Sequence, residues 1–121
     1  MFSSCILRTI EKTKTYRIYE DFYAFTKKDG IIRVPMGFIT DLGTIPEVLQ
    51  SLVQNNAPYI REATILHDWL YSNKSNFLNI SKSKADSLLI EGMEYLGAND
   101  IQCLSVWSAV SVFGYNHWKK D

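Results

Sequence analysis

The residue types best suited to chemistry lie together in one short apolar stretch, residues 63–71, which reads Ala-Thr-Ile-Leu-His-Asp-Trp-Leu-Tyr. His67 and Asp68 are adjacent in this stretch, and Tyr71 follows the histidine by four residues. Residues four apart lie on one face of a helix, whereas adjacent residues point about 100° apart. We therefore expect His67 and Tyr71 to face the same neighbour, and Asp68 to face another direction.

Two interpretations of the pair His67 and Asp68 compete. An imidazole held in one tautomer by a carboxylate can activate water, and an aspartate can hold a hard cation through its oxygens. In the other interpretation, His67 is a hydrogen-bonded core histidine and Asp68 is a surface carboxylate. The pair taken alone favours this second interpretation, because buried polar groups in proteins are usually structural and hydrogen-bonded.

A further carboxylate, Asp86, changes this balance. It falls inside the next predicted helix, two residues before Leu88. Antiparallel packing of two helices across the polar connection 72–80 would bring Asp86 beside His67 and Tyr71. The carboxylate could then orient the imidazole while the Tyr71 hydroxyl holds the carboxylate. The alternative is that Asp86 is an early-helix acid that the helix macrodipole favours.

A loop candidate precedes these helices. Residues 35–46 read Pro-Met-Gly-Phe-Ile-Thr-Asp-Leu-Gly-Thr-Ile-Pro, and this spacing of glycine and proline predicts a shaped loop around Thr40 and Asp41. Asp41 is then either a turn residue or a metal ligand on a loop that faces the helix carrying His67. His117 lies among aromatic residues near the end of the sequence, where we expect packing or surface exposure rather than metal binding.

The composition is that of an ordinary globular domain. With 121 residues, 46% hydrophobic and 21% charged, the chain can bury one core, which predicts a single domain over residues 1–121. Thirteen basic residues balance thirteen acidic ones, so no nucleic-acid partner is expected. Cys5 and Cys103 are far apart in the sequence and indicate neither a zinc site nor a disulfide framework.

Hydropathy predicts neither a signal peptide nor a membrane span. The N-terminal residues lack a basic start followed by a long apolar run, and no stretch approaches the roughly 18 apolar residues that a transmembrane helix needs. The chain is therefore expected in the compartment where it is made.

Hydrophobic periodicity and turn residues predict an α+β fold. Strand-like residues fill the first third of the chain, where Asp29-Gly30 supplies a hairpin turn. The later pattern is helical, with Ser81 or Ser83 and Asn99 as caps and Gly97 as a helix end. We expect the helix carrying His67 to pack antiparallel on the next one. The predicted segments are strands at 5–12, 16–26 and 31–34 within 1–34, a motif loop and short helix at 35–57, and a helical core at 58–121 with helices near 59–71, 81–96 and 100–112.

Two motifs carry a resemblance to a known family. They are similar to the patterns Val-Pro-x-Gly-Phe-x-Thr-Asp-x-x-Ser-x-Pro and Ala-x-x-x-His-Asp-x-Leu-Tyr of small proteins of unknown function found in tailed phages and prophages. The resemblance implies a phage context and the cytoplasm of a bacterial host, or association with the virion, but no established activity. Thr44 stands where that family usually has serine. The matching residues are Val34, Pro35, Gly37, Phe38, Thr40, Asp41, Thr44 and Pro46, then Ala63, His67, Asp68, Leu70 and Tyr71.

Residues 63–115 also resemble the helical core of phospholipases A2, in which a His-Asp-x-x-Tyr helix pairs with a helix carrying Ala-Asp. This resemblance implies that His67 is the general base, Asp68 a calcium-binding carboxylate, Tyr71 the tyrosine that holds the distal acid, and Asp86 that acid. It also implies a divalent cation, calcium first. The loop 37–44 departs from the phospholipase pattern, because it has two glycines and a carboxylate instead of a glycine-rich run.

The sequence thus leaves two functional hypotheses. In the first, a phage hydrolase uses His67, Asp86 and Tyr71 to activate water, while Asp68 and Asp41 hold a cation; contact with a membrane surface follows only if the substrate is a lipid. In the second, the protein is a non-catalytic virion component or an effector that binds a host protein, and the polar set is structural. A catalytic His67 must open onto a cleft, whereas a structural one can be sealed.

Overall fold

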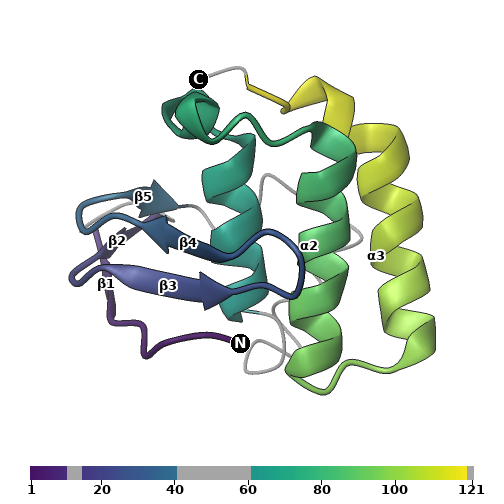
Figure 1. Ribbon diagram of the computed structural model, residues 1–121, viewed down its shortest axis with the longest axis horizontal. Helices are drawn as coiled ribbons and strands as arrows, with labels where there is room; N and C mark the ends of the chain where they lie inside the picture. The colour runs from purple at the N-terminus through teal and green to yellow at the C-terminus, as the bar shows by residue number, and fades with distance from the viewer. Residues whose placement is uncertain (11–14, 41–60, 120–121) are drawn as a thin grey trace.

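The structure, a computed structural model, describes residues 1–10, 15–40 and 61–119. Short strands lie on one side of the molecule and helices on the other (Figure 1). This arrangement confirms the predicted α+β class, with a small antiparallel sheet region preceding the helices. The short helix predicted within 35–57, and Asp41, lie outside the described residues.

The strands form two small antiparallel sheets. A three-stranded sheet has the order β1-β2-β5, and β3 and β4 form a separate two-stranded hairpin. The hairpin turn is the predicted one: Gly30 has a φ of 71°, which glycine adopts without strain, and its carbonyl accepts from the Thr26 N–H. The strands are β1 (Leu7–Thr9), β2 (Tyr16–Ile18), β3 (Phe22–Phe25), β4 (Ile31–Val34) and β5 (Ile39–Thr40).

The predicted single strand over 16–26 is wrong in one respect, because the chain bends at Glu20 and divides it into β2 and β3. Alternation along one continuous strand would place Glu20 on the same face as the fully buried Ile18 and Phe22. The bend keeps the Glu20 carboxylate out of the core, and the Asp21 carboxylate accepts from the Met36 N–H at 2.8 Å.

The helices follow in the predicted order. The chain is helical over 61–71, and then over η1 (Asn73–Leu78), α2 (Lys82–Tyr95), α3 (Asp100–Phe113) and η2 (Gly114–Asn116). Ser81 caps α2, and Asn99 caps α3 in a reciprocal capping box with Gln102. The predicted polar connection between the 61–71 helix and α2 is largely the 3₁₀ helix η1.

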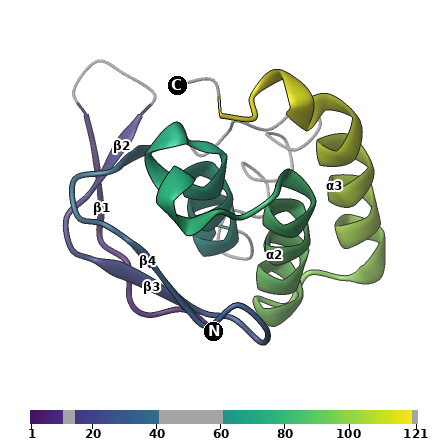
Figure 2. The ribbon, with the colours of Figure 1, turned by 45° about the horizontal axis from the view of Figure 1, so that its top comes forward.

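The 61–71 helix packs antiparallel on α2, as expected. Ala63 near its start lies against Gly92 late in α2, whereas Tyr71 near its end lies within reach of Lys82 at the start of α2. Figure 2 shows this helix between the strands and the pair α2 and α3. Every residue from 63 to 72 is buried, so this helix is the centre of the core rather than an amphipathic surface helix.

Two hydrophobic clusters flank the 61–71 helix. One joins it to the strands and includes Ile18, Phe22 and Val34; the other joins it to α2 and α3 and includes Met93 and Val110. The polar residues that this helix carries are therefore enclosed between two apolar layers. Within the described residues, no helix is both long enough and apolar enough to cross a bilayer.

Candidate functional site

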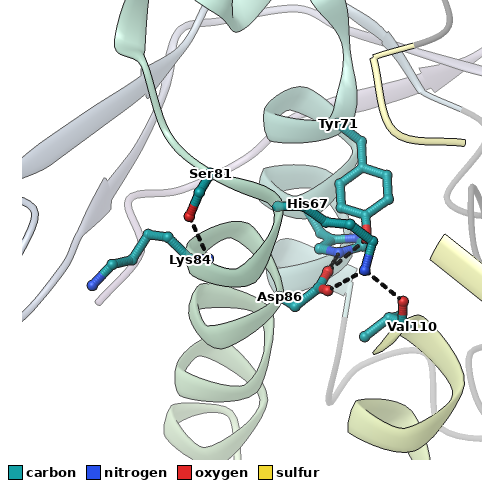
Figure 3. Close-up of polar contacts among 7 residues, drawn as sticks. His67, Tyr71, Ser81, Lys84, Asp86 and Val110 are labelled. Atoms are coloured by element: carbon teal, nitrogen blue, oxygen red, sulfur yellow. Dashed lines mark hydrogen bonds and ion pairs between the residues drawn. The ribbon is translucent and has the colours of Figure 1, made fainter. Parts of the chain in front are cut away.

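A buried carboxylate from α2 meets a histidine and a tyrosine from the 61–71 helix (Figure 3). The distance between His67 Nε2 and Asp86 Oδ1 is 2.8 Å, and the Tyr71 hydroxyl donates to the same oxygen at 2.7 Å. The two rings lie 4.1 Å apart between centroids, because residues four apart stack along one helix face. The structure thus brings together His67, Tyr71 and Asp86.

Lys82 is a fourth member that the sequence reasoning missed. Its ammonium donates to Asp86 Oδ2 at 2.8 Å and to the Val110 carbonyl of α3 at 2.9 Å. It also lies 4.3 Å from the centroid of the Tyr115 ring, which is a favourable position for a cation. The signal in the sequence was the spacing of Lys82 and Asp86, four residues apart on one helix.

The contacts favour an ionised Asp86 beside a neutral His67. Burial acts to raise the pKa of Asp86, but hydrogen bonds from His67, Lys82 and Tyr71 outweigh it and hold the pKa below its usual range. Burial lowers the pKa of His67, despite the opposing effect of the Asp86 carboxylate. Burial and the bond to Asp86 raise the pKa of Tyr71, so the phenol stays protonated and acts as a donor.

The two ring nitrogens of His67 differ in their hydrogen bonding. Nε2 is bound to Asp86, whereas Nδ1 is buried and has no hydrogen-bond partner among the described residues. An ionised carboxylate can only accept, so the proton of the neutral ring is on Nε2 and Nδ1 carries a lone pair. The exposed fraction of His67 is 0%, so the ring does not open onto the surface of this structure.

Asp68 points away from this group, as the helical spacing predicted, and joins the two sequence motifs. The Thr40 hydroxyl of β5 donates to Asp68 Oδ2 in a short hydrogen bond. Both residues are buried, with exposed fractions of 2% for Thr40 and 6% for Asp68. One of the two interpretations of Asp68 made it a surface carboxylate. That interpretation is wrong, because the side chain is buried and contacts Thr40 of β5.

The predicted cation site is incomplete in the described part of the chain. Asp41 lies outside it, and no group of three or more His, Cys, Asp or Glu residues there could hold a metal ion. A hard cation such as calcium takes six to eight oxygen ligands. Among the described residues, Asp68 contributes one carboxylate to such a shell, and Oδ2 of that carboxylate accepts from the Thr40 hydroxyl.

The C-terminal aromatic segment closes over the end of the 61–71 helix. The Trp118 ring packs edge-on against Tyr71, with centroids 5.0 Å apart, and the Lys119 N–H donates to the Tyr71 carbonyl at 2.7 Å. His117 is exposed, so of the two expected positions, packed or at the surface, the structure shows the second. The segment therefore helps to enclose the phenol that holds Asp86.

Fold and site together define a small α+β protein with a carboxylate-centred polar cluster sealed in its core. A family model described as "Protein of unknown function (DUF1353)" matches residues 16–110, which include every described member of the cluster and both motifs. The chain belongs to this family. No curated protein and no solved structure matches it significantly.

Proposed function

We propose that the protein is a phage- or prophage-encoded hydrolase in which His67 acts as a general base. The observation that carries this proposal is the difference between the two ring nitrogens of His67. Nε2 is bound to Asp86, whereas Nδ1 is buried and has no hydrogen-bond partner among the described residues. A structural core histidine normally pairs both ring nitrogens, because an unpaired buried acceptor costs about 1–3 kcal/mol. A histidine base needs one nitrogen oriented by a carboxylate and the other available for a proton.

The proposed reaction is the hydrolysis of an ester or a related bond. Water attacks the carbonyl carbon while His67 Nδ1 takes its proton, and the leaving oxygen then recovers that proton from the imidazolium. The Asp86 carboxylate, 2.8 Å from Nε2, stabilises the charge that develops on the ring. The Tyr71 hydroxyl, 2.7 Å from the same oxygen, keeps the carboxylate oriented.

A divalent cation, calcium by the resemblance to phospholipases A2, is proposed to bind at Asp68 with Asp41. When bound, such an ion supplies stabilisation of the negative oxygen in the transition state. The support is a buried carboxylate directly beside His67 in the sequence. Because no group of three or more His, Cys, Asp or Glu residues among the described residues could hold a metal ion, the steps above are assigned to side chains of the chain itself.

The phage part of the proposal is supported by the two motifs and by nothing in the geometry. It implies action in the cytoplasm of a bacterial host or association with the virion. The partner is then an unidentified substrate or a host or phage protein, and a membrane surface enters only if the substrate is a lipid.

One observation favours a second candidate function. The exposed fraction of His67 is 0%, as expected of a structural network in a non-catalytic virion component or host-binding effector. In that function the cluster fixes the 61–71 helix on α2, and His67→Ala lowers the melting temperature substantially. A stable His67→Ala protein that loses a biological activity would contradict it.

Hydrolysis assays separate the two candidates. Wild type, His67→Gln and the matched control His117→Gln are incubated with phospholipid vesicles and with peptidoglycan, in calcium, zinc or EDTA. The hydrolase proposal expects His67→Gln to lose about a hundredfold or more in rate, whereas His117→Gln retains activity. Identical behaviour of wild type and a folded His67→Gln across this panel refutes catalysis by His67.

Access to the imidazole is tested separately by carbethoxylation with diethylpyrocarbonate, followed by peptide mass spectrometry. The exposed His117 serves as the internal positive control. Catalysis requires water to reach His67, so modification of His67 under native conditions is expected for a hydrolase, at a lower rate than His117. Modification of His67 only after denaturation would support the sealed structural network.

A further inference from the structure

The Asp86 carboxylate receives a different kind of donor on each of its oxygens. Oδ1 lies 2.8 Å from Nε2 of the His67 ring and accepts from the Tyr71 hydroxyl at 2.7 Å, and neither partner is a permanent cation. Oδ2 accepts from the Lys82 ammonium at 2.8 Å, and this is the cationic contact. The exposed fractions of the side chains are 3% for Asp86 and 11% for Lys82, so water screens this ion pair poorly.

The lysine is itself held in place by other elements. Its Nζ donates to the Val110 carbonyl of α3 at 2.9 Å and lies over the Tyr115 ring of η2. Gly114 lies where a Cβ atom would overlap the Tyr71 hydroxyl and come within 3.3 Å of Nζ. The Lys82 ammonium is therefore held in place by contacts with α3 and η2, in addition to its ion pair with an aspartate on its own helix.

The groups that face Asp86 come from each element packed against it. Among the described residues, the 61–71 helix contributes His67 and Tyr71 and α2 contributes Lys82, and Lys82 also donates to the uncharged Val110 carbonyl of α3. Burial disfavours the charged form of a carboxylate, whereas hydrogen bonds from neutral donors act in the opposite direction. An adjacent fixed cation adds a direct electrostatic preference for the charged form.

We infer that Lys82 is a positioning residue that sets the tautomer of His67 by keeping Asp86 in its ionised, acceptor-only form. The charged Asp86 requires the proton of the neutral ring to be on Nε2, which leaves a lone pair on the buried Nδ1. An Asp86 that took up a proton from solvent could instead donate to Nε2, and the single proton of the neutral ring would then be on Nδ1. The inference rests on the proposed function for its catalytic meaning, since only a base needs the free lone pair.

The test reads the tautomer directly, in the full chain and without substrate. Nitrogen-15 shifts of the His67 ring distinguish Nε2–H from Nδ1–H, and the carbon-13 shift of the Asp86 carboxyl reports its ionisation. In wild type at neutral pH we expect Nε2–H and an ionised Asp86. In Lys82→Gln, whose amide can still donate to Asp86 and Val110, we expect loss of the single Nε2–H tautomer and a carboxyl shift toward the protonated form.

Two further variants separate charge from structure. Lys84→Gln is the matched control, because Lys84 is on the same helix but pairs with Asp29 near the surface, at 3.4 Å with a 38% exposed side chain. It should leave both signals unchanged. Lys82→Arg keeps the charge and should restore Nε2–H and an ionised Asp86.

Three results would overturn the inference. They are an Nδ1–H ring or a protonated Asp86 in wild type, a folded Lys82→Gln with both signals unchanged, and equal changes in Lys84→Gln. An Nδ1–H ring or a protonated Asp86 in wild type overturns the inference even if Lys82→Gln does not fold. These signals need no activity, so a positive result with an inactive protein would reject the hydrolase and leave the role of Lys82 intact.

Discussion

Replacing Tyr71 by phenylalanine isolates one hydrogen bond of the buried cluster. The hydroxyl donates to Asp86 Oδ1 at 2.7 Å, and the exposed fraction of Tyr71 is 1%. Phenylalanine keeps the ring contacts with His67 and Trp118, whose centroids lie 4.1 and 5.0 Å away. The substitution therefore removes a donor from an ionised acceptor with little change in packing.

The expected loss follows from the charge of the acceptor. A hydrogen bond to a charged group contributes about 1.5–3 kcal/mol to stability. Because Asp86 keeps its bonds to His67 and Lys82, we expect about 2 kcal/mol. For a domain of this size, that free energy corresponds to a decrease of roughly 8 °C in melting temperature.

Urea unfolding at neutral pH, with linear extrapolation, measures this loss. Tyr95→Phe is the matched control, since Tyr95 lies on α2 with 61% of its surface exposed, and its loss should be near zero. In an Asp86→Asn background, Tyr71→Phe should cost clearly less than in wild type, because the charged acceptor is gone. A loss below about 0.5 kcal/mol in the wild-type background would refute the view of Asp86 as an ionised acceptor for Tyr71.

Three further outcomes are expected. Burial lowers the pKa of folded His67 below its ordinary value of 6.5, so the unfolded chain binds the proton first as the pH decreases. This one residue should therefore make the free energy of unfolding fall below about pH 6.5, by at most about 1.4 kcal/mol per pH unit. Urea titrations at several pH values should show this slope in wild type and a reduced slope in His67→Gln. Gly92→Ala should lower the melting temperature by several degrees in calorimetry, because its Cβ would lie 2.8 Å from that of Ala63 and force the 61–71 helix away from α2; an unchanged melting temperature would show that this contact can relax. Asn99→Ala should cost about 1 kcal/mol in urea unfolding, through loss of the α3 cap and its box with Gln102, while Asn99→Ser should restore most of it.

Local chemistry in the sequence determined the helix limits and the main turn. Ser81 and Asn99 were recognisable as caps because their side chains accept from backbone N–H groups that a helix leaves unpaired. Gly30 and Gly97 have φ values of 71° and 100°, which few other residues adopt. These signals act over a few residues, and no distant contact is needed to interpret them.

The sequence also predicted that His67, Tyr71 and Asp86 come together, but only as one of two alternatives. In the other alternative, Asp86 was an acid that the helix macrodipole favours early in its helix. Helical spacing set His67 and Tyr71 on one face, and a short connection favoured antiparallel packing of the next helix. The spacing does not say how deeply the helix is buried. The difference matters, because a histidine with an exposed fraction of 0% differs chemically from one that lines a cleft.

Only the tertiary structure decided the remaining features. The bend at Glu20 arises from the need to keep its carboxylate out of a core that is built from both strands beside it. The contact of Thr40 with Asp68 joins residues 28 positions apart. Lys82 reaches its full set of partners only when α3 and η2 pack beside α2. The sequence by itself thus indicated three members of the cluster, His67, Tyr71 and Asp86. Long-range packing decided their burial and their hydrogen-bond partners, which together set their charge and their accessibility to water.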